Sequence, residues 1–171
     1  MATILSKQNI EKLLACKPPL IEGLISPKKQ LQPNGVDLTL RDIALFQSPG
    51  KITTSNSQRV VSELSPLMFN GLGFIHLAPG IYSITYNEIV HLPEDIMALA
   101  TPRSSLLRCG VTINTAVWDA GYSGRSQSLL VVYHPQGFQL QKNARIIQLV
   151  FFRLPNQTEG YSGTYQHENL D

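Results

Sequence analysis

The sequence has 171 residues, which suits one globular domain because a single hydrophobic core usually serves about 100–200 residues. Hydrophobic residues make up 43% and charged residues 15%, a composition that excludes a disordered chain. The formal net charge of +2 gives no general attraction to nucleic acid or to an anionic membrane. Cys16 and Cys109 form no CxxC motif, and no apolar run approaches the ~18 residues of a membrane span. We therefore expect one cytoplasmic domain over 1–171 that binds neither nucleic acid nor membranes.

The first predicted element is a helix near the N-terminus. Ser6 can cap it, and Ile10, Leu13 and Leu14 fall on one face before Pro18 ends it. This helix is expected to be short.

From residue 31 onward the pattern changes to short apolar or alternating runs separated by turn residues such as Pro79-Gly80. Such a pattern predicts an all-β fold of antiparallel strands, a sandwich or jelly roll. The polar residues 51–65 are expected to form a surface strand and loop. The predicted strands are Val36–Leu40, Ile43–Phe46, Gly73–Leu77, Ile81–Thr85, Ile96–Ala100, Val111–Val117, Leu129–Tyr133 and Ile146–Leu154.

The last residues, 155–171, have no apolar periodicity but contain two tyrosines and two glycines. This composition suits a mobile segment that becomes ordered over a ligand, and a frayed chain end is the alternative.

The acidic residues are unevenly placed. Residues 96–158 contain six cations and a single acid, Asp119, which gives this stretch a local net charge of +5. Arginine presents a planar set of donors that matches phosphate oxygens, and a lone carboxylate among such groups can activate water. The arginines could instead lie along solvent-exposed strand edges.

Two local sequences carry the phosphate hypothesis. Arg103-Ser104-Ser105 with Arg108 follows an apolar strand, so hydroxyls and backbone N–H groups at this turn could hold an anion. Arg145 and Gln148 alternate imperfectly with apolar residues, which predicts that at least one of them lies against the sheet.

A third local sequence, Asp119-Ala120-Gly121-Tyr122-Ser123-Gly124, is predicted to form a turn after a strand. Its glycines let the backbone approach a planar ligand closely, and Tyr122 offers an aromatic face to a sugar. Asp119 could also be a simple turn cap.

These sequences resemble the motifs of the homotrimeric dUTPase and dCTP deaminase family, and in particular its archaeal-type dUTPase branch. The resemblance covers residues 32–166 in five ordered motifs: 32–38 (QPNGVDL), 102–106 (PRSSL), 119–124 (DAGYSG), 145–149 (RIIQL) and 160–166 (GYSGTYQ).

The resemblance implies a β-clip or jelly-roll-like homotrimer that hydrolyses dUTP, with active sites between subunits. It makes Asp119 the carboxylate that activates water and Tyr122 the ring that packs on deoxyribose and disfavours a 2′-hydroxyl. Asp37 would support the site through a metal-bound water, and Mg²⁺ would be held mainly by the triphosphate, with no metal site made by the protein alone. The expected substrate-binding residues are Arg103, Ser104, Ser105, Arg108, Tyr122, Gln127, Arg145, Gln148, Tyr165 and Gln166.

One position separates the two activities of this family. Deaminases that resemble this sequence place a glutamate about ten residues after the motif aspartate, where this sequence has Leu129. Residues 120–158 contain no Asp or Glu, and Gln127 cannot transfer protons as a glutamate does. We therefore expect hydrolysis of dUTP. A dCTP deaminase, alone or coupled to hydrolysis, and a non-catalytic nucleotide-binding trimer are the alternatives.

Overall fold

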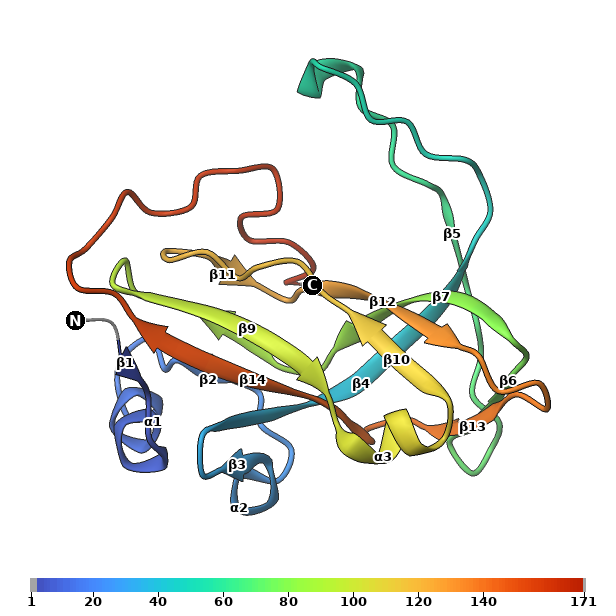
Figure 1. The fold of residues 1–171 in the computed structure, drawn as a ribbon, viewed down its shortest axis with the longest axis horizontal. Helices are drawn as coiled ribbons and strands as arrows, with labels where there is room; N and C mark the ends of the chain where they lie inside the picture. Colours follow the sequence, from blue (N-terminus) through green and yellow to red (C-terminus); the bar gives the residue numbers. More distant parts are fainter. Residues whose placement is uncertain (1–2, 171) are drawn as a thin grey trace.

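The computed structural model describes residues 3–170 and shows a fold of antiparallel strands with a few short helices (Figure 1). Helix α1 (Lys7–Leu14) begins after Ser6, whose hydroxyl accepts a hydrogen bond from the Asn9 N–H at 3.4 Å. Ile10 is fully buried on its inner face. The predicted N-terminal helix is confirmed. Over residues 3–170, none of the helices has the length and apolar character to cross a bilayer.

The main sheet contains nine antiparallel strands, and its central strands carry much of the core. Strands β3 (Leu31–Gln32) and β5 (Leu64–Pro66) pair with β4, and β9 (Ile96–Pro102) pairs with β14. The predicted all-β class is confirmed. The other six strands lie in the order β1 (Thr3–Ile4), β14 (Arg145–Arg153), β4 (Gly35–Phe46), β7 (Gly80–Tyr86), β12 (Gln127–Val132) and β10 (Val111–Asn114).

Two smaller sheets and three short helical segments complete the fold. One sheet has the order β11 (Ser123–Gly124), β8 (Ile89–His91), β2 (Ile21–Glu22), and the other pairs β13 (Phe138–Gln141) with β6 (Phe74–Leu77). The helical segments are α2 (Pro27–Gln30), the 3₁₀ turn η1 (Asn56–Gln58) and α3 (Ser104–Arg108).

Three of the predicted strands differ from those observed. Val36–Leu40 and Ile43–Phe46 are one strand, β4, because the chain passes through a register shift between Leu40 and Asp42 without turning. The strand predicted over Val111–Val117 ends at Asn114, and beyond it only Trp118 makes an isolated bridge, to Ala98. This early end releases the loop that carries Asp119.

Buried aliphatic side chains from neighbouring strands hold the main sheet together. Leu38, Ile84, Leu130 and Leu149 are inaccessible to solvent and come from β4, β7, β12 and β14. Burial of a side chain of this size contributes about 1.5–3 kcal/mol. The segments that follow these strands are therefore attached to a rigid frame.

Two long segments leave this frame. Residues 47–63 form an extended arm that bends over one end of the molecule (Figure 1). The Arg59 guanidinium in this arm lies 5.3 Å from the centre of the Tyr165 ring. The tail, residues 155–170, returns from β14 across the loop between β10 and β12 (residues 115–126; the β10–β12 loop). The Tyr161 N–H donates to the Ala120 carbonyl at 2.8 Å and the His167 N–H to the Ser123 carbonyl at 2.7 Å.

Gly35, at the start of β4, is a position where the fold admits no side chain. A Cβ atom there would lie 2.2 Å from the Leu149 carbonyl oxygen, a backbone atom of a buried strand. We predict that Gly35→Ala lowers the free energy of unfolding by about 2–3 kcal/mol, because the two strands must separate. Urea unfolding measures the change.

Gly71→Ala is the matched control, since nothing lies within 4 Å of a Cβ at that position. It should change the free energy of unfolding by less than about 0.5 kcal/mol. Equal effects of the two substitutions would contradict the close contact between β4 and β14 at Gly35.

Candidate active site

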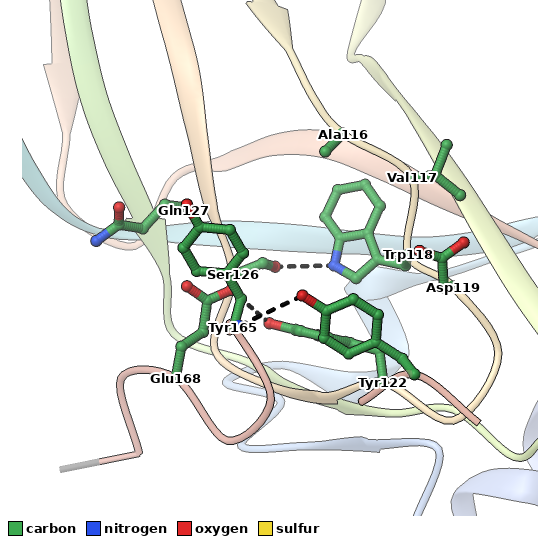
Figure 2. A pocket seen from close by; sticks show the side chains of 10 residues that line it. Ala116, Val117, Trp118, Asp119, Tyr122, Ser126, Gln127, Tyr165 and Glu168 are labelled. Carbon is green, nitrogen blue, oxygen red and sulfur yellow. Dashed lines mark hydrogen bonds between the residues drawn. The ribbon is translucent and has the colours of Figure 1, made fainter. Parts of the chain in front are cut away.

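A pocket of about 440 Å³ lies between the β10–β12 loop, the start of β12 and the tail. Its size lies in the range of small-molecule sites. Asp119 and Gln127 lie on opposite sides of the pocket, with the Tyr122 and Tyr165 rings between them (Figure 2). The pocket therefore contains four of the residues that sequence analysis assigned to the site. The remaining lining residues are Ala116, Val117, Trp118, Ser126, Tyr161 and Glu168.

The Asp119 carboxylate is exposed in this pocket. The Asp119 carbonyl accepts a hydrogen bond from the Tyr122 N–H at 3.1 Å and so closes a turn. The side chain takes no part in that turn, and within residues 3–170 its carboxylate has no hydrogen-bond or ion-pair partner. A turn cap uses its carboxylate on nearby N–H groups, whereas this one is available to a ligand or to water.

Tyr122 is held rigidly in the pocket. Its side chain is only 5% exposed, and its ring packs edge-on against Tyr161 with centroids 5.8 Å apart. Its hydroxyl donates to Glu168 Oε1 at 2.9 Å. Burial raises the pKa of Tyr122 well above its ordinary value, and the nearby Glu168 charge raises it further, so the hydroxyl remains a donor.

Glu168 is a pocket residue that sequence analysis missed. Burial raises the pKa of its carboxyl, and the hydrogen bond from Tyr122 partly opposes this rise. Glu168 lies in a tail without periodicity, and its partner is 46 residues away. Only its place two residues after Gln166 could have drawn attention to it.

Gln166 binds the protein backbone. Its Oε1 accepts from the Ser123 N–H and its Nε2 donates to the Gly121 carbonyl, both at 2.9 Å. Gly121 has a φ of +82°, and a Cβ there would lie 2.6 Å from the Gly160 Cα, so this glycine lets the tail approach. Gln166 and His167 line a second pocket of about 550 Å³ behind the loop. Adjacent tail residues thus face different pockets.

A second set of site residues surrounds Asp37, which is 1% exposed. Asp37 Oδ2 lies 3.0 Å from Arg103 Nε and 3.1 Å from Arg145 Nη1. Burial raises the pKa of the Asp37 carboxyl, and the two guanidinium groups oppose that rise. The carboxylate therefore holds two arginines from different segments in place.

The remaining predicted residues lie around these arginines. Ser104, Ser105 and Arg108 are exposed on α3, and Arg108 Nη1 donates to Ser104 Oγ at 3.2 Å. Gln148 is in register with Asp37 on β4 and with Thr101 on β9. We call this set the α3 cluster: Arg103, Ser104, Ser105, Arg108, Arg145 and Gln148.

The pocket and the α3 cluster lie apart within one chain. Trp118, next to Asp119, bridges Ala98 near the beginning of β9, whereas α3 follows Pro102 at its end. Ala98 and Pro102 are four residue steps apart, about 13 Å along the strand. None of the residues that line the Asp119 pocket belongs to the α3 cluster. One chain therefore presents two halves of the predicted site.

The cations of residues 96–158 do not form one patch. Arg125 Nη1 donates to the Tyr86 carbonyl at 3.0 Å, Arg153 pairs with Asp95, and Lys142 Nζ lies 3.8 Å from Asp42. The other three cations belong to the α3 cluster. The six cations that lie close together in the sequence are therefore only partly close together in the structure.

The described residues offer little to a metal ion. Within residues 3–170 there is no group of three His, Cys, Asp or Glu side chains that could hold one. The Asp37 carboxylate, which the resemblance linked to a metal-bound water, is occupied by two arginines.

Relatives of known family match nearly the whole chain. The sequence is 51% identical over 169 residues to a "Probable deoxyuridine 5'-triphosphate nucleotidohydrolase" of Methanococcoides burtonii, covering 98% of this chain and 99% of the relative. The protein of the same description from Methanosarcina mazei is 52% identical over 169 residues, with the same coverage. That from Archaeoglobus fulgidus is 46% identical over 168 residues and 98% of both chains.

A solved structure and a family model agree with these relatives. The fold resembles the crystal structure of 2'-deoxycytidine 5'-triphosphate deaminase from Agrobacterium tumefaciens, with a TM-score of 0.66 and 20% identity over 89% of this chain and 48% of that chain. At this identity the likeness concerns the fold alone. The model of the dCTP deaminase-like family matches residues 4–154. With this match and relatives about 50% identical, the chain belongs to the dCTP deaminase-like family, as the resemblance of its motifs predicted.

Proposed function

We propose that this protein is a dUTP diphosphatase, which hydrolyses dUTP to dUMP and pyrophosphate. The observation that carries the proposal is the Asp119 carboxylate, unpartnered within residues 3–170 and exposed in a pocket beside the Tyr122 ring. The archaeal relatives are described as probable deoxyuridine 5'-triphosphate nucleotidohydrolases, a name that denotes hydrolysis of dUTP. The α3 cluster supplies hydroxyl and guanidinium donors of the kind that bind phosphate oxygens.

In the proposed mechanism Asp119 accepts a proton from a water molecule that attacks the α-phosphorus. The P–O bond to the β-phosphate breaks, and pyrophosphate leaves with the bonding electrons. The guanidinium and hydroxyl groups of the α3 cluster stabilise the charge that develops on pyrophosphate. Tyr122 packs against the deoxyribose, and Gln127 and Tyr165 line the nucleotide pocket. Mg²⁺, held by the triphosphate, would neutralise charge on the phosphate oxygens.

The separation of the two halves supports a homotrimer with shared sites. Asp119 cannot reach a phosphate that lies on the α3 cluster of its own chain, since about 13 Å of strand β9 lies between them. A neighbouring copy can bring its α3 cluster to this chain's pocket, and a ring of three copies repeats this contact at every interface. We propose that each active site takes the pocket of one subunit and the α3 cluster of the next.

Deamination of dCTP is the second candidate, because the family model that matches is described as dCTP deaminase-like. The position of the deaminase glutamate is Leu129, on β12 and in register with Ser83 of β7. A leucine cannot transfer protons, so hydrolysis remains the proposal. Ammonia and pyrophosphate measured together from dUTP and dCTP distinguish the two activities.

The first prediction concerns Asp119. With Mg²⁺ the protein should release pyrophosphate from dUTP, and Asp119→Asn should lower kcat by about 10²–10⁴-fold, because the amide cannot accept the proton of water. Affinity for a non-hydrolysable dUTP analogue should change little. Absence of pyrophosphate release by the unaltered protein would reject the proposed function, and full activity of Asp119→Asn would reject the role of this residue.

The second prediction tests whether the sites are shared. Asp119→Asn and the double variant Ser104→Ala/Ser105→Ala should each be poorly active, because every site in either protein lacks one half. Co-assembled in equal amounts, they should regain about one quarter of the normal activity, since random assembly pairs an intact pocket with an intact α3 cluster in about one site in four. Pyrophosphate release measures the recovery. A mixture no more active than its components would show that each site lies within one chain.

The third prediction concerns Asp37. Asp37→Asn leaves Arg103 and Arg145 without their buried counter-charge, so the free energy of unfolding should fall by about 2–3 kcal/mol. The arginines should also lose their positions, which should raise KM for dUTP by about tenfold. Urea unfolding and initial-rate kinetics measure the two effects.

Asp42→Asn is the matched control, because Asp42 is an exposed acid that pairs with Lys142 and Arg41 at the surface. It should change the free energy of unfolding by less than about 1 kcal/mol and leave KM unchanged. A normal KM for Asp37→Asn would contradict the positioning role of Asp37.

A further inference from the structure

The carboxylate of Glu168 lies in the candidate nucleotide pocket and has no part in the proposed hydrolysis. It is half-buried, and its Oε1 accepts the hydrogen bond from the Tyr122 hydroxyl. A chain end that only frays would gain nothing from taking a carboxylate out of water, since such burial costs free energy unless the charge is hydrogen-bonded. The position of this side chain therefore requires an explanation.

The tail backbone holds Glu168 in place from both sides. Before it, the His167 N–H donates to the Ser123 carbonyl, and at Glu168 itself the carbonyl accepts from the Arg125 N–H at 3.0 Å. After it, the Asn169 carbonyl accepts from Arg125 Nε and the Asn169 amide donates to the Arg125 carbonyl, both at 2.9 Å. The Glu168 carboxylate is thus held in the pocket by a tail segment that is hydrogen-bonded on both sides of it.

Tyr122 is the group on which Glu168 acts. Glu168 Oε1 accepts the hydrogen bond that the Tyr122 hydroxyl donates. Ser126, whose Oγ accepts from Trp118 Nε1, also lies within hydrogen-bonding reach of the Tyr122 hydroxyl, but it is a neutral group of the same loop. Tyr161 restrains one edge of the ring and Glu168 restrains its hydroxyl end. A ring held at both places cannot tilt to make room for an additional oxygen on a ligand.

We propose that Glu168 is a positioning residue for sugar specificity, which locks the Tyr122 ring so that a nucleotide with a 2′-hydroxyl is rejected. The inference rests on the proposed function, because it takes Tyr122 as the surface against which the sugar packs. Glu168 acts through Tyr122 and need not touch the reacting atoms. Loss of the lock lets the ring move, and a ribonucleotide then enters more easily.

The size of the effect follows from the bond that is removed. A hydrogen bond to a charged acceptor contributes enough to change an equilibrium by about tenfold or more. Glu168→Ala should therefore lower the ratio of kcat/KM for dUTP to that for UTP by about tenfold. The change should arise mainly from better use of UTP, with a smaller rise in KM for dUTP.

The experiment compares four variants with the unaltered protein. Glu168→Ala removes the acceptor, Glu168→Gln keeps an acceptor oxygen without the charge, and Tyr122→Phe removes the donor but keeps the ring. Glu168→Ala/Tyr122→Phe completes a double-mutant cycle. Pyrophosphate release from dUTP and UTP gives the specificity ratio, and the Kd values of non-hydrolysable dUTP and UTP analogues give the same ratio without turnover.

Glu159→Ala is the matched control. Glu159 lies in the same tail, is exposed and lies outside the lining of the pocket. Its substitution should leave the specificity ratio unchanged, which separates the effect of this carboxylate from a general effect of altering the tail.

The proposal expects Glu168→Gln to keep most of the discrimination and Glu168→Ala to lose it. Tyr122→Phe should lose about as much as Glu168→Ala, and the double variant no more than either, because both remove the same bond. An unchanged ratio in Glu168→Ala, or losses that multiply in the double variant, would overturn the proposal. So would an equal loss of activity toward both nucleotides in Glu168→Gln, which would assign proton transfer to this carboxyl.

Failure of the proposed function gives a different result. A protein that releases no pyrophosphate but whose ratio of analogue Kd values falls in Glu168→Ala is a binding protein in which the inference about Glu168 holds. A protein that binds neither analogue overturns both.

Discussion

The ion pairs of the buried Asp37 carboxylate are the constraint on which one half of the site depends. Asp37 comes from β4, Arg145 from the start of β14 and Arg103 from the turn between β9 and α3, so one carboxylate joins three segments that are far apart in the sequence. A carboxylate with so little exposure is stable only while both guanidinium groups face it. The orientation of α3 and its exposed serines follows from this cluster.

The other half depends on hydrogen bonds between the tail and the β10–β12 loop. Gln166 bonds with both of its amide atoms to the loop backbone, and Glu168 reaches the hydroxyl of Tyr122. The pocket that contains Asp119 is therefore built from two segments, and neither forms it alone. Different interactions stabilise the two halves. A buried ion-pair network holds the α3 cluster, and hydrogen bonds between the tail and the β10–β12 loop hold the pocket.

Much of the sheet could be predicted because its long strands have alternating apolar residues. The short strands β2, β8 and β11 have two or three residues, too few to show any periodicity. The sequence also did not reveal that two predicted strands form the single strand β4. A register shift within a strand and a turn between strands both interrupt the apolar pattern with polar residues. These errors in single strands did not affect the predicted all-β class.

The residues of the candidate site differ in how far the sequence indicated their roles. The isolation of Asp119 among cations marked it as functional, and the structure leaves its carboxylate exposed in a pocket. The arginines could not be sorted, because Arg103 and Arg125 differ only in what folding places beside them: a buried carboxylate for one and backbone carbonyls for the other. Glu168 was not predicted, since its role depends on a tertiary hydrogen bond that no local pattern records.

The crossing of Gly121 and Gly160 divides the tail into a spacer before it and a segment of fixed register after it. The two backbones meet there without side chains, and beyond that point Tyr165 and Glu168 line the Asp119 pocket, whereas Gln166 and His167 between them line the pocket behind the loop. Insertion or deletion of a single residue between the crossing and Glu168 would change which tail residues face each pocket and move the glutamate away from the tyrosine. The exposed residues 155–159, before the crossing, should accept such changes more readily, so the same tail combines a tolerant spacer with a segment whose register is strict.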